Sequence, residues 1–563
     1  MRLIECVPNI SEGKDRSKID LIAAAAAEVE GVMLLDIDPG ASTNRTVITI
    51  AGEPENVAEA AFRLIKRASE LIDMSKHKGE HPRQGATDVC PFIPISGVSM
   101  EECVEIAKKV GERVGRELGV PVYLYENAAS NEERRNLANC RKGEYEAIEK
   151  ISTPEWKPDF GPTSVTDQVK KSGITTIGAR EFLVAYNVNL NTTSTRRANA
   201  IAFDIREAGR IVRDGDPLTG KPVLDAQGEP VRIPGTLKSV KGIGWYIEEY
   251  GIAQLSLNLT NINVTPVHIA FEESVAKAAE RGIRVTGSEL VGLIPLQSML
   301  DAADYFLKKQ ERSLGISEAE KIHLAIKSLG LDDLAPFNPQ EKVIEYVIAA
   351  KSKGQKRLAD LDLIAFCNAT ASESPAPGGG SISAYCGAMG ASLGAMVANL
   401  SAHKRGWDDR WEEFSDWAVK ALDYQKKLLA LVDEDTLAFN RIMEAFGLPK
   451  GTDDEKKNRS QAIEEATRYA IEVPLQTARL ALGSMDVLKE MVLKGNPNSV
   501  TDGAVGALCA RTAVIGACMN ARINVTSLKD KEYAALALKE AQEMEKAADL
   551  IERAIRDEIA KKM

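Results

Sequence analysis

Apolar positions in the first third of the chain alternate between a period of two and a helical period. Stretches of period two predict β-strands, and stretches of helical spacing predict amphipathic α-helices. The predicted strands are Arg2–Val7, Val32–Asp38, Thr46–Ala51, Val89–Ser96 and Pro121–Glu126. The predicted helices are Asp15–Glu30, Pro54–Ile72, and one that starts at the capping box of Ser99 and Glu102 and ends near Gly119.

The order of these elements is β-α-β-β-α-β, followed by one more helix and strand. This is the order of a ferredoxin-like domain. The order recurs over the elements Phe182–Leu190, Ser194–Ala208, Leu237–Tyr246, Ala253–Asn261, Pro266–Arg281 and Ile283–Ser288. No sequence repeat accompanies it, so we predict a repeat of architecture only.

Beyond Leu358 the strand pattern disappears and long helical periods follow, at Trp407–Phe446, Asp453–Leu493, Thr501–Ile523 and Asp530–Lys562. A chain of 563 residues also exceeds what one hydrophobic core holds. We therefore predict an α/β (α+β) N-terminal module of two ferredoxin-like βαββαβ subdomains, followed by an all-α helical-bundle module. The predicted bounds are 1–178 and 179–335 for the subdomains, 336–356 for a linker and 357–563 for the helical module.

The composition, with 44% apolar and 27% charged residues, is ordinary for a soluble globular protein. A formal charge of −11 argues against a general nucleic-acid binder, which needs a basic face. The eight cysteines form no CxxC pair and the first residues lack the apolar core of a signal peptide. These features favour a reducing, cytoplasmic location.

Residues 381–402 contain no charged side chain. This uncharged stretch is long enough to span a bilayer. The stretch is built on Gly387, Gly390 and Gly394, with Asn399 near its end, and no second uncharged stretch of this kind exists. We interpret it as a central helix packed closely on neighbouring helices, and expect no membrane partner.

The densest polar cluster of the first half is Ser75–Arg83, between a predicted helix and a predicted strand. His77, Glu80 and His81 formally fit the H-x-x-E-H zinc pattern, but Gly79 and Pro82 argue against the helix that this pattern needs. The cluster could also be a solvated turn, or one histidine could be a general acid and base. Spacing alone does not decide among the three.

The helical half has three polar segments. Gly378, Gly379 and Gly380 precede Ser381 at the start of a small-residue helix, which suits either close backbone approach to a ligand or a linker turn. Asp433, Glu434 and Asp435 lie inside a long helix, and Asp435 has i, i+4 spacing to the apolar Leu431 and Phe439. The third segment is Asn498–Asp502, for which the alternative is that Ser499 or Asp502 only caps the following helix.

The first half of the chain contains six long motifs: ECVPNISEG at the start, LLDIDPGASTNRT, LIDMSKHKGEHPRQGATDVCPFIPISGVSMEECV, DFGPTS, GITTIGAREFLVAYNVNL and KGIGWYIEE. Together they resemble the transferase module of the formimidoyltransferase-cyclodeaminase family. The segment PGGGS and the aspartate-containing helix resemble the family's cyclodeaminase module, so the resemblance covers essentially the whole chain.

In the N-terminal module the resemblance implies that His81 is the catalytic histidine. We expect Asp38 to orient His81 and Arg83 to hold a substrate carboxylate, with a turn aspartate and a surface cation as the alternatives. The family's folate loop falls on Gly161, Pro162, Thr163 and Ser164 and runs to about Gly173. Here the segment TDQVKKSG is slightly longer than in the family, and a plain loop between subdomains is the alternative.

In the helical module the resemblance implies that Asp435 is catalytic, with Asp433 as the weaker candidate. It also implies that Gly378, Gly379, Gly380, Ser381 and Asp502 line a folate site. The implied substrates are N-formimino-L-glutamate and tetrahydrofolate, the latter polyglutamylated, with no metal. From the Gly- and Ala-rich helices we also predict a homo-oligomer of this chain, with the cyclodeaminase site near a subunit contact. The rivals are a second module that is a methenyltetrahydrofolate cyclohydrolase, and a folate-binding scaffold without catalysis.

Overall fold

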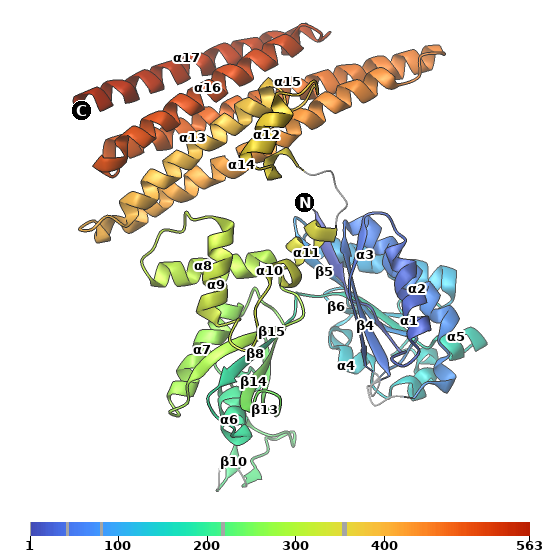
Figure 1. Cartoon of the computed structure of the whole chain (residues 1–563). Helices are drawn as coiled ribbons and strands as arrows, with labels where there is room; N and C mark the ends of the chain where they lie inside the picture. Colours follow the sequence, from blue (N-terminus) through green and yellow to red (C-terminus); the bar gives the residue numbers. More distant parts are fainter. Residues whose placement is uncertain (1, 41–43, 79–82, 216–219, 352–356, 563) are drawn as a thin grey trace. The chain divides into compact units, whose positions relative to one another are not determined.

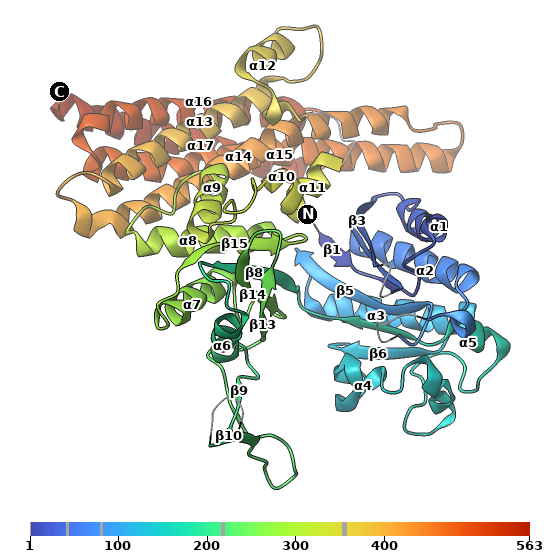
Figure 2. The ribbon, with the colours of Figure 1, turned by 60° about the horizontal axis from the view of Figure 1, so that its bottom comes forward.

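A computed structural model describes residues 2–40, 44–78, 83–215, 220–351 and 357–562. The chain divides into two compact units. One consists of Met1–Met299 with Leu329–Lys353, and the other of Leu300–Ser328 with Gly354–Met563. Figures 1 and 2 show that the first unit contains the sheets and that the second contains the long helices.

The first sheet has seven strands: β1 (Leu3–Cys6), β2 (Asn9–Ile10), β3 (Val32–Gly40), β4 (Arg45–Gly52), β5 (Thr87–Ser96), β6 (Val122–Glu126) and β7 (Thr175–Ala179). Its helices are α1 (Arg16–Ala27), α2 (Pro54–Leu71), α3 (Met100–Arg113), α4 (Leu137–Cys140) and α5 (Asp167–Ser172). β3, β4, the β1–β2 pair and β5 lie side by side and antiparallel, which is the predicted ferredoxin-like arrangement.

Strand β7 pairs in parallel with both β5 and β6, and so lies between them. The sequence pattern did not predict this strand. The predicted boundary at 178/179 is wrong, because it falls inside β7, whose last residue Ala179 pairs with Glu126.

The second sheet consists of β8 (Val184–Leu190), β13 (Val240–Ile247), β14 (Ile252–Leu259) and β15 (Val285–Val291), with helices α6 (Thr195–Ile205) and α7 (Val267–Ala279). The strand order β13-β14-β8-β15, all antiparallel, is that of a ferredoxin-like domain. Two small pairings lie in the segment between α6 and β13, namely β9 (Arg210–Ile211) with β12 (Arg232–Ile233), and β10 (Arg213–Asp214) with β11 (Lys221–Pro222). The prediction of two ferredoxin-like subdomains is confirmed.

Two other predicted bounds are corrected. Residues 336–351 are not an open linker, because they form α10 (Pro339–Lys342) and α11 (Ile344–Lys351), and Val343 is fully buried and bridges to Ile294. Residues 300–328, which include most of α8 (Leu296–Lys309) and α9 (Glu318–Leu329), belong to the helical unit. There the carbonyl of Gly315 accepts a hydrogen bond from Asn399 at 2.6 Å. Periodicity identifies a helix but not the core on which it packs.

The helical unit also contains α12 (Leu363–Thr370), α13 (Gly379–Ala402), α14 (Trp411–Gly447), α15 (Asp453–Lys494), α16 (Val500–Val525) and α17 (Lys531–Lys562). Short 3-10 or π turns lie at Met74–Lys76, Val114–Leu118, Glu132–Arg135, Tyr145–Ser152, Leu358–Asp360, Asp408–Arg410 and Pro497–Ser499. Helices α13 and α16 pack closely, since a Cβ on Gly390 would lie 2.7 Å from the carbonyl oxygen of Gly506.

Within the part of the chain that the structure describes, two helices have the length and apolarity to cross a membrane, Gly379–Ala402 and Pro497–Val525. The second contains Asp502, Arg511 and Arg522 and is therefore not an uncharged stretch. In their most apolar windows, 61% and 44% of the residues are buried within the protein. Burial of this kind is what core helices of a bundle show, and length and composition alone are weak grounds for a membrane span.

Candidate active sites

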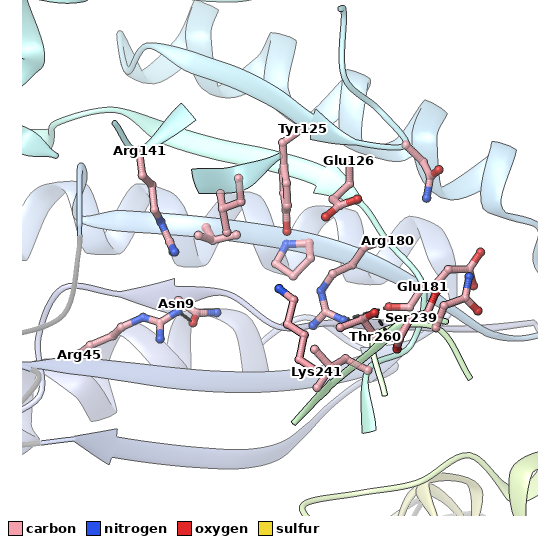
Figure 3. Close-up of a pocket in the computed structure, with 16 residues that line it drawn as sticks. Asn9, Arg45, Tyr125, Glu126, Arg141, Arg180, Glu181, Ser239, Lys241 and Thr260 are labelled. Carbon is pink, nitrogen blue, oxygen red and sulfur yellow. Dashed lines mark hydrogen bonds between the residues drawn. The ribbon is translucent and has the colours of Figure 1, made fainter. Parts of the chain in front are cut away.

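The first unit holds a cavity of about 580 Å³. Its walls come from β2, β4, β5 and β6 of the first sheet, from α4 and the residue after it, from the segment after β7, and from β13 and the residues that follow β14. Among the residues that the structure describes, six charged ones line it: Arg45, Arg141, Arg180, Lys241, Glu126 and Glu181 (Figure 3). Four cations against two carboxylates suit an anionic small molecule, and the volume suits a ligand of that size.

Backbone strain accompanies this cavity. Glu126 and Ser239, which both line it, have φ angles of 53° and 54°. Asn44, which precedes the lining residue Arg45, has a φ of 49°. Non-glycine residues rarely adopt this left-handed conformation, and such strain gathers at functional sites.

Buried polar groups hold two of the cavity's arginines. The Arg45 guanidinium donates a hydrogen bond to Asn9 Oδ1, and Asn9 Nδ2 donates to the carbonyl of Val7 at 2.7 Å. The Arg141 guanidinium donates to Asp88, whose side chain is fully buried. The backbone N–H of Gln84 donates to the same carboxylate at 2.9 Å. These partners fix the direction of both guanidinium groups.

A further acid lies close to Arg180. Glu5 of β1 is only 5% exposed. Burial raises the pKa of Glu5 to about 7, and the nearby Arg180 guanidinium lowers it. The charge beside Arg180 therefore changes near neutral pH.

His81, the catalytic histidine that the resemblance implies, lies outside the described residues. Asp38 lies exposed in β3 opposite Val47, so its predicted role towards His81 stays a prediction. The other histidine of the cluster, His77, lies with its Nε2 2.9 Å from the carbonyl oxygen of Asn44.

Arg83 is neither exposed nor free. It is 8% exposed, and its guanidinium donates to Glu144 at 2.8 Å and to both oxygens of Glu146 at 2.8 and 2.9 Å. The alternative of a surface cation is wrong. To bind a substrate carboxylate as predicted, Arg83 would have to exchange one of these two glutamates for the substrate.

In the predicted folate loop, the backbone geometry explains why positions 161 and 173 are glycines. Gly161 has a φ of 88°, and a Cβ there would lie 2.5 Å from the carbonyl oxygen of Val120. Gly173 has a φ of 67°, and a Cβ there would lie 2.2 Å from the carbonyl oxygen of Gln84. Neither glycine is among the cavity's lining residues, nor are Pro162, Thr163 and Ser164. Folate contacts of this loop stay a prediction.

In the helical unit, two segments that the sequence singled out contact each other: the glycine segment that ends at Ser381, and the part of α14 that contains Asp435. The backbone N–H of Ser381 donates a hydrogen bond to Asp435 Oδ2 at 2.8 Å, and its hydroxyl donates to the same oxygen at 3.1 Å. Gly380 faces the other oxygen, since a Cβ there would lie 2.0 Å from Asp435 Oδ1. Glycine at this position is therefore what lets the carboxylate reach the first turn of α13.

Asp435 is half-buried, and burial raises its pKa above the ordinary aspartate value, while the hydrogen bonds from Ser381 oppose that rise. Such a carboxyl exchanges protons more readily near neutral pH than an exposed one. Asn520 of α16 lies beside the same turn, 3.2 Å from the position of a Cβ on Gly379. The centre thus combines a carboxyl group of raised pKa, hydrogen-bonding groups and glycine backbone without side chains.

Two neighbouring acids have structural roles. Asp433 accepts hydrogen bonds from the backbone N–H groups of Leu358 at 2.6 Å and Ala359 at 3.4 Å. Glu434 accepts a hydrogen bond from the hydroxyl of Tyr469. The preference for Asp435 over Asp433 agrees with these contacts.

Asp502 does not belong to this centre within one chain. It lies in the first turn of α16, eighteen residues from Asn520 on the same helix. At about 1.5 Å per residue the two positions are roughly 27 Å apart. The grouping of Asp502 with the glycine segment is therefore corrected for a single subunit.

Within the described ranges, no group of three His, Cys, Asp or Glu side chains is placed to hold a metal ion. Glu80 and His81 of the H-x-x-E-H pattern lie outside those ranges. The expectation that no metal is needed stays a prediction.

The sequence did not single out Arg45, Arg141, Arg180 and Lys241, which line the cavity. Three of them lie inside motifs that carried the family resemblance: Arg45 in LLDIDPGASTNRT, Arg180 in GITTIGAREFLVAYNVNL and Lys241 in KGIGWYIEE. The charged residue inside each of these motifs was the sequence feature that could have identified it as a candidate site residue. Arg141 lies in none of the motifs, and only the fold brings it to the cavity.

Three family models match the chain in order. Residues 3–180 match the N-terminal subdomain of the formiminotransferase domain, residues 185–349 the formiminotransferase domain, and residues 362–543 formiminotransferase-cyclodeaminase. The formimidoyltransferase-cyclodeaminase of Mus musculus is 44% identical over 533 residues, which are 94% of each chain.

Two shorter relatives each match one half. A glutamate formimidoyltransferase of Streptococcus pyogenes is 42% identical over 55% of this chain and 95% of its own length. A methenyltetrahydrofolate cyclohydrolase of Methylorubrum extorquens is 35% identical over 31% of this chain and 85% of its own length. The two halves of the chain thus have counterparts that exist as separate proteins.

Proposed function

The chain belongs to the formimidoyltransferase-cyclodeaminase family, and on that premise we propose that it catalyses two successive one-carbon reactions of histidine degradation. The first transfers the formimino group of N-formimino-L-glutamate to N5 of tetrahydrofolate and releases L-glutamate. The second cyclises 5-formimidoyltetrahydrofolate to 5,10-methenyltetrahydrofolate and releases ammonia. The observation that carries the proposal is the contact of Asp435 with Ser381 and Gly380, which assembles the helical centre from two family motifs.

For the first reaction the cavity of the α/β unit is the proposed site. N5 of tetrahydrofolate attacks the amidine carbon, and the tetrahedral adduct expels the glutamate nitrogen. His81, carried over from the resemblance, takes the proton from the attacking nitrogen and returns it to the leaving nitrogen. The four cations that line the cavity support binding of substrates that carry carboxylates.

For the second reaction Asp435 is the proposed proton acceptor. N10 of the folate attacks the formimino carbon, and Asp435 takes the proton that N10 loses. The protonated Asp435 then assists the departure of ammonia. The hydrogen bonds of Ser381 to Oδ2 support this role, because they fix the carboxylate and leave Oδ1 for proton transfer. Gly378, Gly379 and Gly380 give the substrate access to the backbone there.

The second candidate for the helical unit is a methenyltetrahydrofolate cyclohydrolase, which the similarity to the Methylorubrum extorquens enzyme favours. Water would then attack the methenyl carbon in the same pocket. Ammonia release from 5-formimidoyltetrahydrofolate separates the two, because only the deaminase produces it.

We further propose that the folate is polyglutamylated, that no metal takes part, and that the protein is cytoplasmic. All eight cysteines are free, which supports a reducing compartment. Activity that survives dialysis against a chelator would support the metal-free reaction, and loss that added metal restores would contradict it.

We also propose a homo-oligomer that forms through the helical unit. Exposed apolar side chains form one stripe on α13, at Met389, Met396 and Leu400, and another on α16, at Val505, Leu508, Met519 and Ile523. Each set recurs at helical spacing, so each lies along one face of its helix. Exposed apolar faces of this extent usually contact a partner.

The test is an assay of N-formimino-L-glutamate with tetrahydrofolate that follows methenyl-folate absorbance and ammonia together. Wild type is expected to produce both. The variant His81→Ala is expected to lose the first reaction but to release ammonia from supplied 5-formimidoyltetrahydrofolate. Absence of both products from the wild type, with tight folate binding retained, would support the rival of a non-catalytic scaffold.

A further inference from the structure

Tyr125 and Glu126 are consecutive residues at the end of β6, and both line the cavity of the first unit (Figure 3). In a regular strand two consecutive side chains point to opposite faces of the sheet. Glu126 departs from that rule because its φ is 53°, in the left-handed region. The left-handed backbone is what lets a second side chain in a row reach the same cavity.

Backbone hydrogen bonds hold Glu126 in this conformation. The N–H of Asn127 donates to the carbonyl of Ala179 at 3.0 Å, and the N–H of Ala128 donates to the carbonyl of Tyr125 at 3.1 Å. Glycine adopts a left-handed φ without strain, whereas glutamate does not. A glutamate that the fold keeps here in spite of the strain indicates a use for its side chain.

The Glu126 carboxylate is half-buried and open to a ligand. Among the residues that the structure describes, none donates a hydrogen bond to this carboxylate and none forms an ion pair with it. Burial raises the pKa of Glu126, and nearby positive charges, that of Arg180 most, lower it. The other lining carboxylate, Glu181, accepts a hydrogen bond from Asn263 Nδ2 at 3.1 Å. A carboxylate withdrawn from water without a partner gains most from a ligand that supplies N–H donors.

An apolar floor adjoins this carboxylate. Pro91 of β5, Gly178 of β7 and Tyr125 of β6 lie in register across three neighbouring strands. Pro91 and Tyr125 line the cavity, and the Tyr125 ring lies over Gly178, where a Cβ would be 2.4 Å from Tyr125 Cδ1. Such a floor suits a flat ring, and the carboxylate beside it suits N–H donors on the edge of that ring.

We infer that Glu126 binds the edge of the tetrahydrofolate pterin that carries N3–H and the 2-amino group. The inference rests on the function proposed above and adds to it the residue that recognises the pterin. The two donors are parallel and match the two oxygens of a carboxylate, as two N–H groups of a guanidinium do.

N-formimino-L-glutamate also carries N–H groups, but it fits this place less well. It has no ring to cover Pro91 and Tyr125, and its two carboxylates would lie close to the negative charge of Glu126. Tetrahydrofolate carries its carboxylates at the end of the molecule away from the pterin. The pterin is therefore the part of the substrates that Glu126 suits.

The test compares Glu126→Gln and Glu126→Gly with wild type in the first reaction. Glutamine keeps the size but turns an N–H group towards one of the pterin donors, and glycine removes the side chain. Each variant is expected to raise the KM for tetrahydrofolate about 10- to 100-fold, with the KM for N-formimino-L-glutamate within about twofold. Glu126→Gly is also expected to keep or raise the melting temperature, because it removes the left-handed strain. Its loss of affinity would then not reflect unfolding.

Glu311 provides the matched control. It is also a glutamate with a left-handed φ, 54°, but it lies in the helical unit and does not line the cavity. Glu311→Gln and Glu311→Gly are expected to leave both KM values of the first reaction unchanged. An equal rise in the KM for tetrahydrofolate in the Glu311 variants would contradict the inference.

An analogue identifies the edge of the pterin that Glu126 binds. 2-Desamino-2-methyltetrahydrofolate has a methyl group in place of the 2-amino group. Wild type is expected to bind it about tenfold or more weakly than tetrahydrofolate, whereas Glu126→Gln is expected to bind the two within about threefold of each other. Equal discrimination by wild type and variant would refute the assignment of this edge.

The inference is overturned if Glu126→Gln keeps the wild-type affinity for tetrahydrofolate, or if it weakens N-formimino-L-glutamate alone. Failure of the proposed function looks different, because the wild type would then transfer no formimino group. In that case calorimetry with tetrahydrofolate on wild type and Glu126→Gln still decides whether Glu126 binds the pterin.

Discussion

Asp435, inside a 37-residue helix, accepts a hydrogen bond at 2.8 Å from the backbone N–H of Ser381, which lies 54 residues earlier in the chain. The contact caps the first turn of α13 with a carboxylate from another helix, where the helix dipole favours negative charge. It also unites the two features of the helical half that the sequence singled out separately.

Replacement of Asp435 by asparagine is expected to stop the second reaction and spare the first. Asparagine has nearly the same shape and can still accept from Ser381, but it cannot take the proton from N10. Ammonia release should fall by about 10²-fold or more, and 5-formimidoyltetrahydrofolate should accumulate. The control is Asp433→Asn, which loosens the cap on Leu358 and Ala359 and should chiefly lower the melting temperature.

Gly380→Ala tests the close approach at that turn. The new methyl group would lie 2.0 Å from Asp435 Oδ1, so the carboxylate must move. Ammonia release is expected to fall about tenfold or more, because even small displacements of a catalytic group are costly. Gly447→Ala, on the same helix as Asp435 and with no atom near the added methyl group, should change nothing. Equal activity of both variants would show that the contact is not needed.

The pH dependence of ammonia release should reflect Asp435. Burial raises its pKa, so the loss of activity on the acid side should begin at a higher pH than for an exposed aspartate. Because Ser381 opposes that rise, Ser381→Ala should move the acid-side midpoint to still higher pH. Ser383→Ala, which removes a hydroxyl bonded to the Gly379 carbonyl, is the comparison and should leave the midpoint in place. A shift in the opposite direction would contradict the assignment.

Glu5 should make stability depend on pH. Its folded pKa is about 7 and its ordinary value is 4.5, so between these values the folded state holds a proton that the unfolded state has lost. Stability therefore decreases as pH rises from 4.5 to 7. Glu5→Gln removes this dependence and should gain on the order of 3 kcal/mol relative to wild type between pH 5 and pH 8. Urea unfolding of both proteins at the two pH values measures the difference, and parallel curves would refute it.

Ile523→Glu should weaken self-association. Ile523 is 69% exposed on the apolar stripe of α16, and a carboxylate there resists burial in an interface. The expected result is a smaller particle in analytical ultracentrifugation. Leu550→Glu replaces a side chain of equal exposure, 68%, on α17 outside both stripes, and should leave the particle size unchanged. Dissociation by Leu550→Glu alone would move the interface to α17.

The sequence by itself determined the order of the elements, the two ferredoxin-like subdomains and the change to helices only. Periodicity records which face of each element is buried, and that information is local. The sequence also indicated the glycine segment at residues 378–380 as a candidate site. The i, i+4 spacing of Asp435 to apolar residues favoured it over Asp433. Strand β7 was not predicted because its sequence, TTIGA, has a single large apolar residue and therefore no apolar period.

Only the tertiary structure decided which side chains meet. Three contacts depend on packing between elements. Arg45 and Arg141 share a cavity, Arg83 is neutralised by Glu144 and Glu146, and Asn520 lies beside the turn at Gly379. The same holds for residues 300–328, whose helical pattern fits either unit. A pattern along the chain specifies an apolar face, but the partner of that face follows from how all the faces pack together.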